Sequence, residues 1–204
     1  MHDIVFLRHG ISEGVEQGIL QGHLDLPLAP RGKEQIRGLA DYWGATHQTF
    51  DRALFSPLAR ARETCEIIAT ALSIPQVEVE PDWIERDFGQ GEGAPLPVTT
   101  DWYRSRRRPT PFEPIFESGE TEWHVHLRAG RAIEKLLNLP EGRYLVVSHG
   151  NILNAAMRMI LGLLPYGQTL PVEMGLDPGC YARVQYQPTT GGWKLVSFNA
   201  GAGQ

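Results

Sequence analysis

The 204-residue sequence predicts a three-layer α/β fold with a mainly parallel central sheet, helices on both faces and an antiparallel edge. Short apolar runs at residues 3–7 and 144–148 are typical of buried strands. Helical patterns alternate with strand patterns along most of the chain, which favours parallel strands joined by helices. Residues 180–186 and 193–198 form a hairpin pattern across 188–192, which predicts the antiparallel edge.

Both buried-strand patterns end at a histidine followed by a glycine, and the first also carries an arginine. They read Arg8-His9-Gly10 and Ser148-His149-Gly150. The carboxyl ends of parallel strands meet at one edge of a sheet, where open α/β sheets bind their ligands. A single strand-end histidine is commonly structural, but the repeated ending beside an arginine favours function. We therefore expect these side chains to share a pocket.

The segment after the first strand is a glycine-rich stretch, residues 11–30, without clear periodicity. Loops of this length inside a compact domain are usually functional. A proline then opens a predicted helix over residues 30–46. Residues 51–55 and 77–80 are predicted as the second and third strands.

The helix between those strands, residues 58–72, carries a cation in its first turn. Ser56 suits the N-cap of this helix, and Pro57 suits its first position. Arg60 follows within the first turn, where a cation is unfavourable next to the positive end of the helix dipole. It either points at a bound anion or is exposed, as we expect for Arg62.

The chain is predicted to form a single domain spanning residues 1–204. A proline-rich insertion at about residues 94–117 is predicted to lie over the sheet edge. This insertion is predicted to be helical around residues 100–107. It contains four arginines, Arg104, Arg106, Arg107 and Arg108. Such a cluster is usually a solvated face. In a net-acidic protein it could also draw an anionic substrate inward, and both interpretations stay open.

Helices are also predicted at residues 121–137 and 151–161. The first begins after the helix-capping pair Glu120-Thr121. His124 and His126 lie two residues apart on it and therefore on different faces, so they are not expected to share a metal.

Bulk composition excludes several classes of function. The net charge of −5 implies no general affinity for nucleic acid or for an anionic membrane. Cys65 and Cys180 are expected to be small buried hydrophobic residues, with neither a disulfide nor a metal site. No apolar run approaches the length of a membrane span, and no signal segment is apparent at the amino terminus. We expect a cytoplasmic location.

Five sequence motifs occur along the chain in a recognisable order. They are Leu7-Arg8-His9-Gly10-Ile11-Ser12, continued by Gly18, Gln21-Gly22 and Asp25-Leu26-Pro27-Leu28; residues 56–64; Ile84-Glu85 through Phe88-Gly89 with Glu92-Gly93; Gly119-Glu120-Thr121; and Val147-Ser148-His149-Gly150. Together they resemble the motifs of the histidine phosphatase superfamily, in the branch shared with cofactor-dependent phosphoglycerate mutase. The resemblance implies a phosphoglycerate mutase-like fold.

The resemblance also implies catalytic roles. His9 would be the nucleophile that becomes phosphorylated, and it must be neutral to attack. Arg8, Arg60 and His149 would clamp the phosphoryl oxygens. Glu85 would protonate the leaving oxygen and then activate water. Asp87 is the alternative acid, although the motif position favours Glu85.

Weaker expectations concern substrate contacts. Ser12, Gln21 and Gly22 are candidate substrate-binding residues, and backbone N–H groups near Asn151 could stabilise an anion. No metal and no other cofactor is expected, because the arginines supply the positive charge.

Several departures from the family pattern bear on the reaction. Gly14-Val15 stands where many relatives carry Trp-Asn, and Gly91 stands where an aromatic residue is common. The segment between Glu85 and Gly119 is shorter than in true mutases, which leaves less material to exclude water. These points favour hydrolysis, while the arginines after Trp102 count mildly towards a mutase.

We therefore expect a phosphomonoesterase that hydrolyses small phosphorylated metabolites through a phosphohistidine. One alternative is a 2,3-bisphosphoglycerate-dependent phosphoglycerate mutase. An alternative of another class is a phospho-ligand or phosphoprotein binding module without turnover. The carboxyl-terminal hairpin could pair with a second copy in a homodimer.

Overall fold

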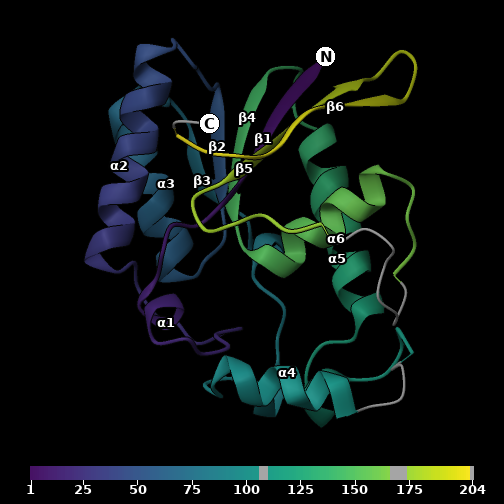
Figure 1. Ribbon diagram of the computed structural model, residues 1–204. Coiled ribbons are helices and arrows are strands. Elements are labelled where there is room, and N and C mark those ends of the chain that lie inside the picture. The colour runs from purple at the N-terminus through teal and green to yellow at the C-terminus, as the bar shows by residue number, and fades with distance from the viewer. Residues whose placement is uncertain (106–109, 166–173, 203–204) are drawn as a thin grey trace.

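The computed structural model describes residues 1–105, 110–165 and 174–202, and its centre is a six-stranded sheet (Figure 1). The strands are β1 (His2–Arg8), β2 (Arg52–Phe55), β3 (Val77–Val79), β4 (Arg143–Ser148), β5 (Tyr181–Gln187) and β6 (Gly192–Ala200). Their order is β3-β2-β4-β1-β5-β6. The first four strands in this order are parallel, while β5 runs antiparallel to both of its neighbours, β1 and β6. The predicted fold class is confirmed.

Helices cover both faces of the sheet. The helices are α1 (Glu13–Glu16), α2 (Pro30–Ala45), α3 (Ala59–Leu72), α4 (Leu96–Ser105), α5 (Glu122–Leu137) and α6 (Gly150–Ile160), with short 3₁₀ turns at Pro81–Trp83, Gly89–Gly91 and Ile115–Glu117. The alternation of strand side chains explains the layers. Val5 and Leu7 pack into one core cluster with α2 and α3, whereas Ile4 and Phe6 pack into another with α5 and α6.

Three neighbouring strands end at the same edge of the sheet. Arg8 at the end of β1 pairs in register with Ser148 at the end of β4. The N–H of His9 donates to the carbonyl of Ser148 at 2.9 Å, and the N–H of Ser56 donates to that of Val147 at 3.0 Å. The residues that follow β1, β2 and β4 are therefore fixed side by side, and α4 lies below this edge (Figure 1).

The structure corrects some local predictions. The stretch at residues 11–30 contains α1, which Ser12 caps through its side chain. Ser56 is not an N-cap, because α3 begins at Ala59 and Leu58 holds the cap position without a side-chain hydrogen bond. Helix α4 starts at Leu96, earlier than residue 100, because Leu96 to Thr99 already form its first turn.

Other predictions concern the two cysteines and the arginine cluster. Cys65 is buried as predicted, whereas Cys180 lies just before β5 and is only partly buried. Arg106, Arg107 and Arg108 lie outside the described residues, as does the side chain of Arg104. The roles predicted for these arginines therefore stay predictions.

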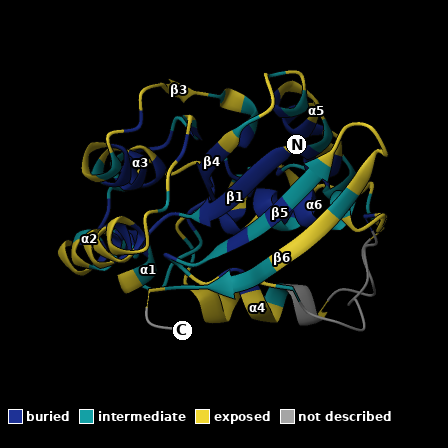
Figure 2. Ribbon diagram, turned by 90° about the horizontal axis from the view of Figure 1, so that it is seen from above, coloured by how far each residue is buried: buried dark blue, intermediate teal, exposed yellow. Residues whose placement is uncertain are grey.

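Strand β6 forms an outer edge of the described sheet, and its exposed side is visible in Figure 2. Leu195 and Val196 of this strand are 45% and 43% exposed. Pairing of this edge with a second copy stays a prediction, and so does the single-domain organisation. Among the described helices, none combines the length and apolar character needed to cross a bilayer.

Candidate active site

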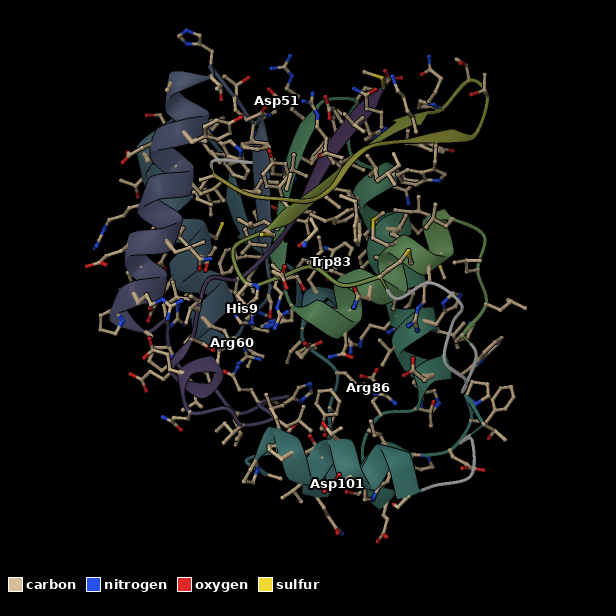
Figure 3. All side chains as sticks on the ribbon, viewed as in Figure 1. His9, Asp51, Arg60, Trp83, Arg86 and Asp101 are labelled. Carbon is tan, nitrogen blue, oxygen red and sulfur yellow. The ribbon has the colours of Figure 1, made fainter. Side chains whose placement is uncertain are left out.

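His9 lies directly after β1 and is almost completely buried at the sheet edge, close to Arg60 (Figure 3). Its Nδ1 is 2.7 Å from the carbonyl oxygen of Gly10. A carbonyl oxygen only accepts hydrogen bonds, so Nδ1 carries the proton of the neutral ring. The lone pair is consequently on Nε2, the nitrogen that is free to attack an electrophile.

The surroundings of His9 favour its neutral form. Burial, followed by the charges of Arg60 and Arg8, holds the pKa of His9 well below its ordinary value of 6.5. The same causes, burial first and then Arg60, hold the pKa of His149 well below 6.5. The two imidazole rings lie 5.1 Å apart between centroids. This edge of the sheet therefore holds two neutral imidazoles beside the cations Arg8 and Arg60.

His149 follows β4 and is fully buried, with both ring nitrogens engaged. Its Nδ1 accepts a hydrogen bond from Nε of Arg60 at 3.2 Å. Because this contact leaves Nδ1 without a proton, the neutral ring carries its proton on Nε2, which donates to Oγ of Ser56 at 2.6 Å. Ser56, which sequence reasoning placed at a helix cap, instead orients the second histidine.

Arg60 projects from the first turn of α3 and is 1% exposed. Its guanidinium donates to the carbonyls of Leu24 at 2.8 Å and Gly22 at 2.7 Å. Burial lowers its pKa to about 10, so it stays protonated at neutral pH. Of the two interpretations left open for Arg60, exposure is wrong, whereas Arg62 is exposed as expected.

Arg8, at the end of β1, lies near both histidines. Its Nη1 donates to the carbonyl of Leu176 at 2.7 Å, while its buried Nε has no hydrogen-bond partner in the described structure. A Cβ atom on Gly150 would lie 3.5 Å from Cζ of Arg8, so the guanidinium packs against the start of α6. A buried donor without a partner is costly, and an anionic ligand would satisfy it.

Glu85 is buried, and its carboxylate lies at the amino terminus of α6. Oε1 accepts from the N–H groups of Ile152 at 3.2 Å and Arg86 at 2.9 Å. Oε2 accepts from the N–H of Asn151 at 3.3 Å and from its side-chain amide at 3.4 Å. The donors predicted to hold a substrate anion near Asn151 therefore contact Glu85 here.

Asp87, the alternative acid, is occupied locally. Its Oδ1 accepts from the N–H of Gly89, the first residue of the adjoining 3₁₀ turn, at 2.6 Å. Glu85, in contrast, interacts electrostatically with both Arg8 and Arg60. The geometry favours Glu85 as the carboxyl group of the pocket.

The predicted substrate contacts, Ser12, Gln21 and Gly22, form hydrogen bonds within the protein. Oγ of Ser12 donates to Oε1 of Gln21 at 2.9 Å, and both side chains are buried. Gly22 has a positive φ of 52°, and its carbonyl accepts from Arg60. Their role in substrate binding stays a prediction. Among the described residues, no group of three or more His, Cys, Asp or Glu side chains could hold a metal ion.

A family model described as the histidine phosphatase superfamily (branch 1) matches residues 4–201. The chain belongs to this superfamily. The expectation of an enzyme of the histidine phosphatase type is confirmed. An uncharacterized phosphatase PhoE of Bacillus subtilis is 31% identical over 98% of this chain and 95% of its own length. A probable phosphoglycerate mutase GpmB of Enterobacter sp. is 30% identical over 95% of this chain and 90% of its own.

Solved structures of two phosphatases share the fold. A mycobacterial glucosyl-3-phosphoglycerate phosphatase superposes with a TM-score of 0.82 at 22% identity, covering 98% of this chain and 100% of the other. For a putative α-ribazole-5′-P phosphatase of Escherichia coli the TM-score is 0.80 at 22% identity, with 98% and 96% covered.

The departures from the family pattern have local structural explanations. A Cβ atom on Gly91 would collide with the ring of Phe116. That ring lies beside the ring of Trp102, tilted by 36°, with centroids 4.2 Å apart. Phe116 thus fills the space that an aromatic residue at position 91 would need. A Cβ atom on Gly14 would likewise collide with the side chain of Gln21.

Sequence reasoning missed His23 and gave no individual role to Glu92, which it placed only within the third motif. Nε2 of His23 lies 2.8 Å from the carbonyl oxygen of Glu85, and the N–H of His23 donates to Oε1 of Glu92 at 2.8 Å. Oε1 of Glu92 also accepts from the N–H of Phe88 at 3.1 Å. His23 directly follows the Gln21-Gly22 motif, which is the one signal that could have identified it.

Proposed function

We propose that this chain is a phosphomonoesterase that hydrolyses small phosphorylated metabolites through a covalent phosphohistidine on His9. The observation that carries the proposal is the state of His9, whose hydrogen bond to Gly10 leaves a lone pair on Nε2. Burial and two adjacent arginines keep this imidazole neutral. Neutral imidazole is the form that can attack phosphorus.

The other side chains fit the two steps of such a reaction. Nε2 of His9 attacks phosphorus, and Glu85 donates a proton to the leaving oxygen. Glu85 then takes a proton from a water molecule, whose oxygen attacks phosphohistidine and releases inorganic phosphate. Arg8 and Arg60 supply positive charge for the equatorial oxygens, and the unpartnered Nε of Arg8 is a ready donor. The imidazole of His149 lies beside these cations, held by hydrogen bonds to Arg60 and Ser56.

Similarity to known proteins supports hydrolysis, but it also supports the alternative of a phosphoglycerate mutase. The Bacillus subtilis relative is named a phosphatase, whereas the Enterobacter relative is named a probable mutase. We therefore compare phosphate release from phosphomonoesters with isomerisation of 3-phosphoglycerate primed by 2,3-bisphosphoglycerate. We expect release to be faster; isomerisation that outruns release would identify a mutase. Ranking phosphomonoesters by kcat/KM would then define the substrate.

The pH dependence of the reaction is a second test. Protonated His9 cannot attack, so kcat/KM falls as pH drops through the pKa of His9. Because burial, Arg60 and Arg8 hold this pKa well below 6.5, we expect His9 to cause no loss of activity near pH 6.5. Arg8→Gln removes one cation and should move the acid limb to higher pH. Comparing the two enzymes on one substrate cancels the ionisation of the phosphate ester itself, and an unshifted limb would contradict this account.

We also propose that the enzyme needs no metal ion and that it is located in the cytoplasm. Arg8 and Arg60 provide the charge that metal ions supply in many phosphoryl-transfer enzymes. We expect dialysis against EDTA to leave kcat unchanged. Loss of activity that added Mg²⁺ or Zn²⁺ restores would show that a metal takes part.

A further inference from the structure

Glu85 lies on a segment that belongs to no long helix or strand, between the 3₁₀ turns Pro81–Trp83 and Gly89–Gly91. Backbone carbonyls on such a segment have no ladder partners and need other donors. A general acid must nevertheless be held to within a fraction of an ångström of its working position. The support for this segment therefore decides how well Glu85 can act.

Arg128, on the second turn of α5, supplies most of that support. It is 9% exposed. Its Nη1 donates to the carbonyl oxygens of Asp82 at 3.0 Å and Ile84 at 2.5 Å, and its Nη2 donates to that of Glu85 at 3.2 Å. One guanidinium thus binds the backbone of the catalytic segment at Glu85 itself and at two positions before it. The ring nitrogen Nε2 of His23 lies against the same Glu85 carbonyl.

Glu120 fixes the orientation of that guanidinium. Its carboxylate accepts from Nε of Arg128 at 3.0 Å and from Nη2 at 2.6 Å, so all five N–H groups of the arginine are used. The backbone of Glu120 also contacts the catalytic segment. Its N–H donates to the carbonyl of Asp87 at 2.8 Å, and its carbonyl accepts from Nε of Arg86 at 2.9 Å.

We propose that Arg128, clamped by Glu120, is a positioning residue that holds the backbone of Glu85 so that its carboxyl group meets the leaving oxygen. The inference rests on the proposed phosphatase function, in which Glu85 is the general acid. It assigns a task to the Gly119-Glu120-Thr121 motif, whose carboxylate holds the arginine. Lysine cannot replace Arg128, because a single ammonium cannot bind three carbonyls and both oxygens of a carboxylate in a fixed plane.

A merely structural role would lower activity on all substrates alike, so the test must isolate proton donation. Benzyl phosphate has an alkoxide leaving group that needs a proton, whereas 2,4-dinitrophenyl phosphate releases a stable phenolate without one. The ratio of their kcat/KM values reports the general acid. It is measured for the wild type, Arg128→Lys, Glu120→Gln and the control Arg131→Gln, together with the melting temperature of each protein.

Arg131 is a matched control, because it lies on the same helix and its one hydrogen bond and ion pair among the residues described is with the carboxylate of Asp82, at 3.4 Å. We expect Arg128→Lys to lower kcat/KM for benzyl phosphate at least about tenfold more than for 2,4-dinitrophenyl phosphate, as partial loss of general acid catalysis predicts. Glu120→Gln should shift the ratio in the same direction by a smaller factor. Arg131→Gln should leave the ratio unchanged.

If Arg128→Lys and Glu120→Gln both lower kcat/KM equally on the two substrates, so that the ratio is unchanged, the positioning role is overturned. If Arg128→Lys does not fold, the ratio in Glu120→Gln decides, because the glutamine keeps the size and one acceptor of the original side chain. Failure of the proposed function has a different outcome. In that case the wild type itself would form no phosphoenzyme at His9, whatever the ratio in the variants.

Discussion

His9→Ala is expected to lower kcat/KM for phosphomonoesters by at least about 10⁴-fold, the scale seen when an enzyme loses its nucleophile. The substitution removes the one imidazole whose Nε2 carries a lone pair in the pocket. It should also abolish the acid-labile phosphoenzyme that rapid quenching with labelled substrate traps in the wild type. Phosphate release and the quench assay, run on the same preparations, measure both effects.

His124→Ala is the matched control, because this histidine is exposed on α5. It should retain both turnover and phosphoenzyme. Equal turnover by the wild type and His9→Ala would exclude the phosphohistidine mechanism. A wild type that binds phosphate tightly but forms no phosphoenzyme and shows no turnover would instead be a phospho-ligand binding module.

Glu85→Gln is expected to lower kcat/KM for benzyl phosphate by about 10²- to 10⁴-fold, the usual contribution of a general acid. The loss on 2,4-dinitrophenyl phosphate should be much smaller, because its leaving group needs no proton. The carboxylate oxygens of Glu85 accept hydrogen bonds from the backbone N–H groups of Arg86, Asn151 and Ile152. A glutamine amide would turn one NH₂ group towards these donors, so some loss of stability is also expected.

Asp87→Asn separates the two candidate acids. The asparagine oxygen can still accept from the N–H of Gly89, so the local turn should persist. We expect nearly wild-type activity on both substrates. A large loss in Asp87→Asn with little loss in Glu85→Gln would assign the acid to Asp87.

The positions of the strands that lead to His9 and His149 could be predicted from local sequence patterns. Residues 3–7 and 144–148 are apolar, and both runs end at His-Gly, so sheet geometry placed His9 and His149 at one edge. The structure brings their rings to 5.1 Å. The five motifs in order were enough to identify the superfamily, as the match over residues 4–201 confirms.

The partners of the site residues could not be predicted in the same way. Ser56 has the sequence features of a helix cap but orients His149, 93 residues away. Arg128 occupies a helix on which a charged residue is ordinarily exposed, yet it binds carbonyls 43 to 46 residues away. No periodicity or spacing encodes such pairs, because they depend on how α5 packs beside the segment before α4.

By itself, the sequence predicted the α/β class and the two strand-end histidines, because periodicity is a local property of the chain. The motifs that resemble those of the superfamily added the candidate arginines and Glu85. The tertiary structure alone decided that Nε2 of His9 carries the lone pair and that both nitrogens of His149 are engaged. It also decided that Glu85 sits on the start of α6. Protonation and orientation follow from the donor or acceptor that each group meets, and those partners become neighbours only when the chain is folded.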